Sequence, residues 1–413
     1  MLKLLIFTLF LTFTFLEANL LQETIDKAKE GSILKLSRGV YKGSILINKP
    51  LTIIGKEEGV IIDGEGEGTV VTIKSPYVTL KNLTIQGSGD KHENIDSGIK
   101  ISDSKQSEIS NCIIRDSLFG IDISTTNNSI FSNNYITSKK LDLGLRGDGV
   151  RLWYSNDNII TKNKLVKSRD MVVWYSHGNE ISENFGEYNR YSLHFMYAGK
   201  NFVRNNTYQY NSVGIFFMYS KDTIATGNVV KSSLGTTGMG IGLKDVSNFT
   251  LKENTVIYNA IGIYIDRSPF EPDTNNWIEE NQILYNSEGI HFHSLSENNI
   301  IKGNYISGNI EDVVNDSRGA RTYQNEIVGN YWDSYEGFDK NRDNIGDTPH
   351  KIYQYADQLW VYNPTVKFFY GSPVISLLNF LAKLAPFSEP IFLLQDEKPK
   401  LKKQGFNYDK KEQ

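Results

Sequence analysis

Short runs of alternating apolar and polar residues follow one another along most of the chain. Runs such as ILKLSRGVY, SILINKPLTIIG and TVVTI have the period of two that is typical of β-strands, and Gly, Pro and charged residues separate them. From residue 98 onward the runs recur at intervals of 21 to 29 residues, which indicates a solenoid of stacked repeats. The opening residues of these repeats are Gly98, Gly120, Gly149, Asp170, Ser192, Gly214, Gly240, Gly262 and Gly289.

Two columns of apolar side chains emerge when the repeats are aligned. The residues one and three positions after each opening residue are aliphatic or aromatic, from Ile99 and Ile101 to Ile290 and Phe292. Since side chains alternate between the two faces of a strand, both columns should point into a common core. A leucine-rich repeat would place Leu at fixed positions, and this sequence does not. We therefore expect an all-β fold, a right-handed parallel β-helix with three short strands per coil, over residues 19–367.

One Asn per repeat precedes an apolar strand, from Asn82 to Asn330. Stacked at each coil, these residues predict a ladder of side-chain amides along one turn. Where the repeat interval lengthens, loops are inserted at residues 137–147, 232–238 and 268–276. Such loops often carry function.

The N-terminal residues 1–18 have the form of an export signal. Lys3 precedes an apolar run over residues 4–16, and cleavage is expected after Ala18. The apolar run is shorter than the roughly 20 residues of a membrane span, although an uncleaved anchor is the alternative. We expect a periplasmic mature protein whose residues 19–30 form a short amphipathic helix that caps the open edge of the first coil.

The C-terminal part departs from the repeat. The segment NYWDSYEGFDKNRDNIGDTPHKIY, which begins at Asn330, should close the end of the solenoid. Ser372 and Pro373 then offer a good start for an apolar helix of about three turns over residues 372–385. We expect residues 368–413 to form a helical extension and charged tail that docks on a partner.

Charge and cysteine content exclude some classes of function. The chain has 44 basic and 48 acidic residues, with a net charge of −4 and no basic patch, so nucleic acid is not an expected partner. Cys112 is the single cysteine. An intramolecular disulfide and a cysteine-based metal cluster are therefore excluded.

The outward-facing columns carry residues that can bind a soft metal ion. Met196 and Met218 occupy the same position in successive repeats, and His194 shares their face. Imidazole and thioether groups suit Cu(I), which makes these residues copper candidates. Further copper candidates are His177, in the turn one coil earlier, and the outward pair His291 and His293.

Two other interpretations of this face remain open. An inserted loop could cover its Trp, Phe and Met side chains, with His194 hydrogen-bonded at the edge. Alternatively, the face is an exposed apolar patch that docks a partner protein. A partner and a metal are compatible, because a metal that passes between proteins needs both.

A second candidate site lies in the C-terminal segment. Asp339, Asn341 and Asp343 place oxygen atoms at alternate positions before Gly346, and Asp347 follows it, as in the start of a Ca²⁺-binding loop. The downstream bidentate Glu of an EF-hand is missing. A structural Ca²⁺ or Mg²⁺ ion is one interpretation, and a turn held by its own Asx side chains is the other.

Acidic residues near strand starts leave a carbohydrate-active enzyme as the rival hypothesis. Asp148 or Asp170, with Arg151 or Arg169, could form a site for polysaccharide cleavage. The outward carboxylates Asp122 and Asp266 are isolated from each other. No nucleophile elbow, phosphate-binding loop or Cys/His arrangement is present in the sequence.

Several segments give the chain a specific family resemblance. The stretches GDGVRLWYSNDNII, SRDMVVWYSHGNEISEN, YSLHFMYAGKNFVRNN and VGIFFMYSKDTIATGN, together with the C-terminal segments from residue 330 to residue 399, resemble the NosD-type accessory proteins of nitrous oxide reductase maturation. The N-terminal LLQETIDKAKEGSILKLSRGVYKGSILINKPLTIIG is similar to pectin-lyase-like β-helices in general. The resemblance covers nearly everything after residue 18.

The resemblance implies a non-enzymatic role in the periplasm. Such proteins work with an ABC transporter made of a NosF-like ATPase and a NosY-like membrane subunit. They receive copper from a NosL-like chaperone and help supply the copper–sulfur centre of nitrous oxide reductase. On this basis the copper would be transient Cu(I), and the helix at 372–385 would dock on the membrane subunit. A lyase, hydrolase or epimerase on the same fold is the alternative, since fold does not fix function.

Overall fold

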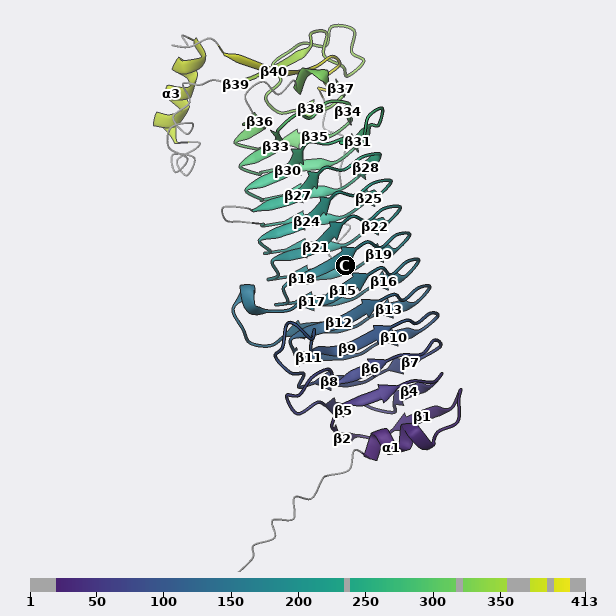
Figure 1. Cartoon of the computed structure of the whole chain (residues 1–413). Helices are drawn as coiled ribbons and strands as arrows, with labels where there is room; N and C mark the ends of the chain where they lie inside the picture. Colours follow the sequence, from purple (N-terminus) through teal and green to yellow (C-terminus); the bar gives the residue numbers. More distant parts are fainter. Residues whose placement is uncertain (1–19, 234–237, 317–321, 355–371, 385–389, 402–413) are drawn as a thin grey trace, which may run out of the picture.

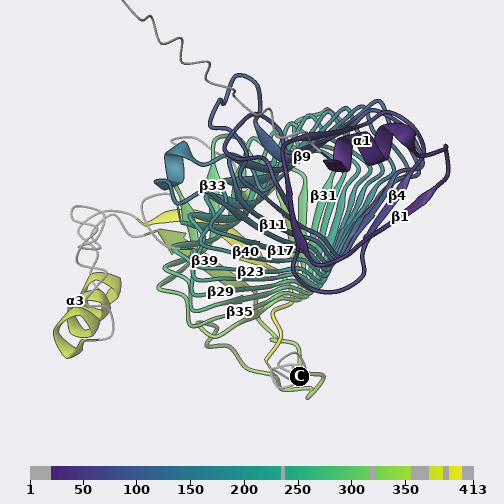
Figure 2. The same cartoon turned by 90° about the horizontal axis from the view of Figure 1, so that it is seen from below.

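The structure is a computed structural model that describes residues 20–233, 238–316, 322–354, 372–384 and 390–401. Over this part of the chain, three parallel sheets run the length of an elongated solenoid (Figure 1). Viewed along its axis, the sheets enclose a single interior (Figure 2). The predicted all-β parallel solenoid is confirmed. The predicted export signal lies outside the described residues.

In the described residues each coil contributes one strand to each sheet, except the last coil, which has none in the third sheet, and the ladders between coils are parallel. The first sheet consists of β1 (Ile33–Leu36), β4 (Thr52–Gly55), β7 (Thr79–Lys81), β10 (Glu108–Ser110), β13 (Ile130–Ser132), β16 (Ile159–Thr161), β19 (Glu180–Ser182), β22 (Phe202–Arg204), β25 (Ile224–Thr226), β28 (Phe249–Lys252), β31 (Asn276–Glu279), β34 (Asn299–Lys302) and β37 (Glu326–Val328). The second sheet consists of β2 (Gly39–Lys42), β5 (Val60–Asp63), β8 (Thr84–Gln86), β11 (Ile113–Ser117), β14 (Tyr135–Ser138), β17 (Lys164–Val166), β20 (Phe185–Glu187), β23 (Thr207–Gln209), β26 (Val229–Lys231), β29 (Thr255–Ile257), β32 (Gln282–Leu284), β35 (Tyr305–Ser307) and β38 (Tyr331–Trp332). The third sheet consists of β3 (Ile45–Ile47), β6 (Val71–Ile73), β9 (Ser97–Ser102), β12 (Phe119–Ser124), β15 (Val150–Trp153), β18 (Asp170–Trp174), β21 (Tyr191–Met196), β24 (Val213–Met218), β27 (Met239–Lys244), β30 (Ile261–Asp266), β33 (Glu288–His293) and β36 (Glu311–Asn315).

The core is the pair of apolar columns expected from the sequence. Every member of both columns, from Ile99 to Phe292, is buried in one continuous cluster. Strand pairing keeps each column in register: Leu193 lies beside Ile215, and Phe195 beside Phe217. The rings of Phe195 and Phe217 stack with centroids 4.9 Å apart. This regular core holds the opposite, outward face of the third sheet rigid.

A ladder of buried Asn side chains runs along one turn of the solenoid. It extends from Asn134 through nine consecutive coils to Asn330, and each amide donates to the Oδ1 of the next residue. Asp396 terminates it, because its Oδ2 accepts from both the backbone N–H and the side-chain amide of Asn330. The predicted ladder is confirmed over this range. Asn82 and Asn111 are exposed residues with positive φ, one position before the ladder column, so they are not members.

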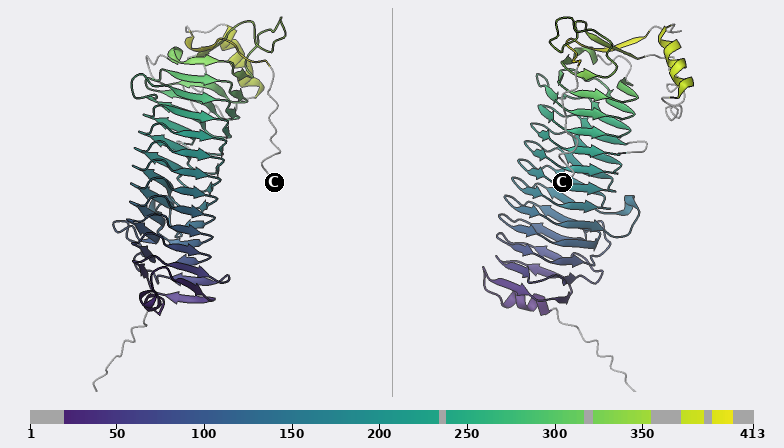
Figure 3. Two further views of the ribbon diagram at one scale, coloured as in Figure 1. Left: turned by 90° about the vertical axis from the view of Figure 1, so that its right-hand side faces the viewer. Right: turned by 180° about the vertical axis from the view of Figure 1, so that it is seen from behind.

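Other elements close the two ends. Helix α1 (Leu20–Lys27) buries Leu21 and Ile25 against the first coil, which confirms the predicted N-terminal cap. The short 3-10 turns η1 (Leu143–Leu145) and η2 (Thr322–Gln324) lie in connections. Strands β39 (His350–Gln354) and β40 (Ile391–Asp396) form an antiparallel pair at the C-terminal end, seen above the stacked coils in Figure 3.

Helix α3 (Pro373–Leu384) occupies nearly the range expected from the sequence. The large apolar side chains that the structure describes in this helix are exposed, including Val374, Leu377, Phe380 and Leu384. Among the helices of the described residues, none has the length and apolar character required to cross a bilayer.

Candidate functional site

The outward columns of the third sheet are stacked as the repeats predict. In the column four residues after each opening residue, Trp153 pairs with Trp174, Trp174 with Met196, and Met196 with Met218. Two residues after the opening residue, Val172 pairs with His194, and His194 with Phe216. The structure therefore brings His194, Met196 and Met218 onto one face of strands β21 and β24.

His194 directly contacts one of the predicted sulfur ligands. Its Nε2 lies 3.3 Å from the Sδ of Met218. The ring stacks on Tyr191, with centroids 4.7 Å apart, and Phe216 lies at 6.2 Å on a tilted plane. Only 8% of His194 is exposed. The imidazole is thus held in a nearly dry aromatic slot, with one ring nitrogen aimed at a thioether.

A buried carboxylate lies behind this ring. Oδ2 of Asp170 is 3.8 Å from Nδ1 of His194, an ion-pair separation beyond hydrogen-bond length, and Nδ1 has no hydrogen-bond partner. Asp170 accepts hydrogen bonds from the guanidinium of Arg190 and from the backbone N–H of Tyr191. Burial raises the pKa of Asp170, but its contacts with His194, Arg190 and Tyr191 more than offset this and hold the pKa below its usual value. Asp170 is therefore a carboxylate at neutral pH and favours a proton on Nδ1.

Aromatic rings continue the face on the N-terminal side. Trp153 and Trp174 meet edge to face with centroids 5.4 Å apart, and the guanidinium of Arg151 lies 5.0 Å from the centre of Trp153. Arg151 also forms a 2.7 Å ion pair with Asp122. Beside the Trp rings runs a stack of four tyrosines at the following turn, with centroids 4.8 to 5.2 Å apart: Tyr154, Tyr175, Tyr197 and Tyr219. The face is accordingly aromatic and partly apolar.

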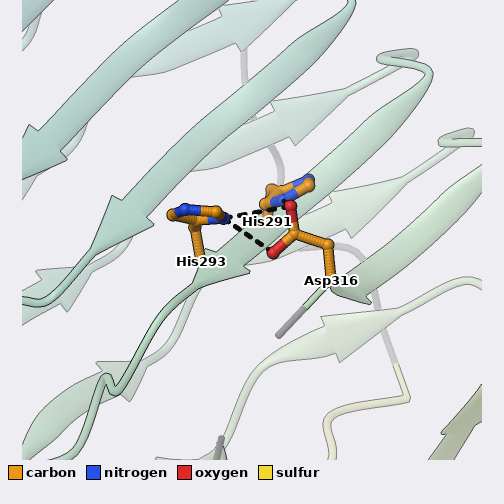
Figure 4. Close-up of side chains that lie close together, drawn as sticks. All are labelled: His291, His293 and Asp316. Carbon is orange, nitrogen blue, oxygen red and sulfur yellow. Dashed lines mark hydrogen bonds and ion pairs between the residues drawn. The ribbon is translucent and has the colours of Figure 1, made fainter. Parts of the chain in front are cut away.

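The second predicted histidine pair belongs to a separate cluster three coils further along. His291 and His293 lie on β33, and Asp316 follows β36 in the next coil (Figure 4). One ligand atom from each of these three residues lies within 4.8 Å of the other two. Tyr264, one coil earlier, lies over both imidazoles, with centroids at 5.4 and 5.9 Å. Asp316 was not predicted from the sequence.

His177 is placed differently from the other predicted copper ligands. It is exposed in the turn after β18, where its backbone N–H donates to Oδ1 of Asn156. Its Nδ1 faces Gly199, one coil further on. The contacts described for His177 connect it to the turns of neighbouring coils and not to His194.

The acidic C-terminal loop uses its oxygens on the backbone. Asp339 accepts the N–H groups of Asp343 and Asn344, and Asp347 accepts that of Lys340. The side chains of Asn341 and Asp343 also hydrogen-bond to each other. These contacts favour the Asx-turn interpretation, and a Ca²⁺ or Mg²⁺ ion in this loop stays a prediction.

The carboxylates considered for carbohydrate chemistry are buried and paired. Asp148 accepts from Arg169 at 2.9 Å, as Asp170 does from Arg190. Burial raises the pKa of Asp148 to about 6, against the lowering effect of Arg169. Asp148 and Asp170 are 3% and 1% exposed, respectively. A polysaccharide on the outer surface would not reach either carboxylate in this arrangement.

The fold and this face define a parallel β-solenoid with candidate metal ligands on one outward sheet. The family described as "Periplasmic copper-binding protein (NosD)" matches residues 132–337, which include both histidine clusters. A "Probable ABC transporter binding protein NosD" of Pseudomonas aeruginosa is 28% identical over 369 residues, covering 85% of this chain and 84% of the relative. A protein of Stutzerimonas stutzeri with the same description is 28% identical over 397 residues and covers 90% and 89%. The chain belongs to the NosD family, and the periplasmic location expected from its N-terminus agrees with the family description.

Similar solved structures show the fold alone. The A-module of the mannuronan C-5 epimerase AlgE6 from Azotobacter vinelandii is 13% identical, with a TM-score of 0.58, and covers 75% of this chain and 92% of the module. The Streptococcus pneumoniae surface protein and adhesin PfbA is 12% identical, with a TM-score of 0.50, and covers 71% and 94%. An enzyme and an adhesin thus share this architecture, so function must be argued from the site.

Proposed function

We propose that this protein is a periplasmic accessory protein of nitrous oxide reductase maturation that carries Cu(I) without catalysing a reaction. Copper arrives from a NosL-like chaperone, is held on the His194 face, and passes to the reductase for its copper–sulfur centre. An ABC transporter of NosF-like and NosY-like subunits couples this transfer to ATP hydrolysis. The observation that carries the proposal is the 3.3 Å approach of His194 Nε2 to Met218 Sδ, in front of a buried carboxylate. The family description and the transporter-binding relatives support it. We also take the coils to wind right-handed, as parallel crossovers do.

The local chemistry suits a soft monovalent ion. The two atoms lie 3.3 Å apart. An ion about 2.0 Å from the imidazole nitrogen and about 2.3 Å from the sulfur would therefore bind both, with a nitrogen–metal–sulfur angle of roughly 100°. Met196, paired with Met218 in the next coil, offers a second thioether on the same face. Asp170 favours the tautomer with its proton on Nδ1, which leaves the Nε2 lone pair for the ion. Thioether and imidazole ligands select Cu(I) over hard cations.

Copper affinity tests this assignment. In competition with a chromophoric Cu(I) chelator, the double variant Met196→Leu/Met218→Leu should bind Cu(I) at least about 10-fold more weakly than the mature protein. His194→Gln should weaken binding similarly. Met239→Leu, in a half-buried position on β27, is the matched control and should bind as the wild type does. Equal affinity in all four proteins would remove the His194 site.

Helix α3 is the proposed dock for the membrane subunit of the transporter. Its exposed apolar residues suit a partner surface near the bilayer, whereas a helix exposed only to solvent would carry charged residues at these positions. A deletion of residues 372–413 would also remove Asp396 and so open the end of the Asn ladder. Point changes are therefore the cleaner test. Leu377→Glu/Leu381→Glu should abolish co-purification with the transporter and leave Cu(I) affinity unchanged, and retained co-purification would refute the dock.

A carbohydrate-active enzyme is the second candidate, and one feature favours it. Asp148, with a pKa of about 6, could transfer a proton near neutral pH. Its burial and its pairing with Arg169 argue against this role. Incubation with polyuronates distinguishes the two functions. Cleavage or epimerisation of the polymer that is lost in Asp148→Asn would favour the enzyme over the copper carrier.

A further inference from the structure

The cluster around His291 has a feature that its own side chains do not satisfy. Nδ1 of His291 forms a 2.6 Å contact with the carboxylate of Glu288, three residues earlier on the same strand. The opposite nitrogen, Nε2, is buried and has no hydrogen-bond partner. It lies 3.2 Å from Oδ2 of Asp316, without the geometry of a hydrogen bond. His291 as a whole is only 8% exposed.

Electrostatics make this contact unfavourable for a neutral ring. With the proton of the imidazole on Nδ1, facing Glu288, Nε2 presents a lone pair to a carboxylate oxygen. A buried polar atom in that position costs free energy unless something positive lies between the two groups. Either a proton on Nε2 or a metal ion supplies that charge.

The other groups of the cluster converge on the same point. Nδ1 of His293 lies 2.8 and 3.0 Å from the two oxygens of Asp316. Figure 4 shows both imidazoles turned toward that carboxylate. Glu288 fixes the orientation of His291 from behind, as a carboxylate commonly does for a metal-bound histidine. Within the described part of the chain, this is the one group of three His, Cys, Asp or Glu residues close enough to share an ion.

We propose that His291, His293 and Asp316 form a second metal site, distinct from the His194 face, that binds a divalent first-row transition ion such as Zn²⁺ or Cu²⁺. Two imidazoles and one carboxylate, with no sulfur, suit ions of intermediate hardness and not Cu(I). Asp316 belongs to the coil after that of the two histidines, so the ion links β33 to the end of β36. Binding consequently stabilises the C-terminal coils against unfolding.

Protonation is the competing explanation. Burial lowers the pKa of His291, but Glu288 and Asp316 raise it by more, so the net shift is upward. A protonated His291 would satisfy the contact without a metal. Direct measurement of metal binding separates the two explanations.

The test uses the full mature chain without a histidine tag, stripped of metal. Competition with a chromophoric chelator measures Zn²⁺ affinity, and thermal unfolding with and without Zn²⁺ measures stabilisation. We expect one Zn²⁺ per chain, a higher midpoint with Zn²⁺, and binding weakened at least about 10-fold in His293→Gln and in Asp316→Asn. His177→Gln removes an exposed histidine elsewhere and should bind Zn²⁺ as the wild type does. Unchanged Zn²⁺ affinity in both cluster variants would overturn the proposal.

Two further measurements guard against misfolded variants and against confusion with the His194 face. Pulsed EPR of the wild-type protein with one equivalent of Cu²⁺ should report two coordinated imidazoles, and a single imidazole would contradict the site. Met196→Leu/Met218→Leu should retain full Zn²⁺ affinity. The two sites are thus tested with different ions, and failure of one leaves the other standing.

Discussion

Replacing Asp396 with Asn should loosen the C-terminal end of the solenoid. Oδ2 of Asp396 accepts from the backbone and side-chain N–H groups of Asn330 and from Nε1 of Trp332, at 2.9 to 3.0 Å. Oδ1 accepts from the backbone N–H groups of Gly329 and Lys398, at 2.9 and 3.0 Å. The carboxylate is fully buried and accepts five hydrogen bonds.

An amide cannot replace this acceptor on both sides. If the carbonyl of the new Asn takes the Oδ2 position, its NH₂ group faces the N–H groups of Gly329 and Lys398. Two hydrogen bonds to a charged acceptor are then lost, at about 1.5 to 3 kcal/mol each, or about 3 to 6 kcal/mol in total. The opposite orientation loses three. Because repeats in a solenoid contact mainly their neighbours, the loss should be local to the end.

Hydrogen exchange followed by mass spectrometry measures this local loss. In Asp396→Asn, peptides covering residues 322–332 and 391–396 should exchange at least about 100-fold faster, since 1.4 kcal/mol corresponds to a factor of ten. Peptides covering 193–218 should exchange as in the wild type. Asp142→Asn makes the same chemical change at an exposed position and should alter neither region. Unchanged exchange at 322–332 in Asp396→Asn would refute the role of this carboxylate as the end of the ladder.

Three other perturbations probe the ladder, the C-terminal end and the His194 face. The side chain of Asn206 makes four hydrogen bonds within the ladder, whereas that of Asn211, a buried residue outside the ladder, makes two. Their Ala variants should therefore lose about 4 and about 2 kcal/mol in urea denaturation, and equal losses would contradict the ladder energetics. Burial lowers the pKa of His350, although Asp396 opposes this, so the unfolded chain takes up the proton first and stability should fall as the pH drops below about 6.5. Replacing His350 with Gln should make that loss of stability shallower in thermal unfolding between pH 7 and pH 5. Identical slopes of stability against pH in the variant and the wild type would exclude His350 as the cause. A Cβ at Gly242 would lie about 2 Å from the ring of Phe216, so Gly242→Ala should displace that ring and weaken Cu(I) binding, whereas unchanged affinity would show that Phe216 does not shape the site.

The regular coils were predictable because strand alternation and repeat spacing act locally. The buried columns from Ile99 to Phe292 and the outward stacking of Met196 on Met218 follow from counting residues within each repeat. The ladder was predictable for the same reason from Asn134 onward. Its start was misplaced because Asn111 adopts a left-handed conformation one residue before the column, where Cys112 takes the inward position.

The contacts that the sequence did not predict join segments outside the regular repeats or depend on the register between strands. Asp396 reaches Asn330 across 66 residues, and no repeat specifies that pairing. Asp316 lies after the final strand of the third sheet, where the spacing that aligned His291 with the earlier coils no longer applies. Asp170 was recognised as an acidic residue near Arg side chains, but its place behind His194 required the register of β18 and β21. Periodicity thus located the faces, and the polar partners that orient the ligands came from the three-dimensional structure.

The stacked core also limits how a bound ion could dissociate from the protein. Many binding proteins release their ligand by opening a hinge between two domains, but here the candidate ligands stand on strands of one continuous parallel sheet. The two clusters are separated by the three coil steps from β24 to β33, about 14 Å at the spacing of parallel strands. The hydrogen-bonded strands fix that separation, and it does not change without breaking the sheet. On the function proposed above, a bound ion would therefore leave when a partner protein offers better ligands at the outward face of this sheet, while the solenoid itself keeps its shape.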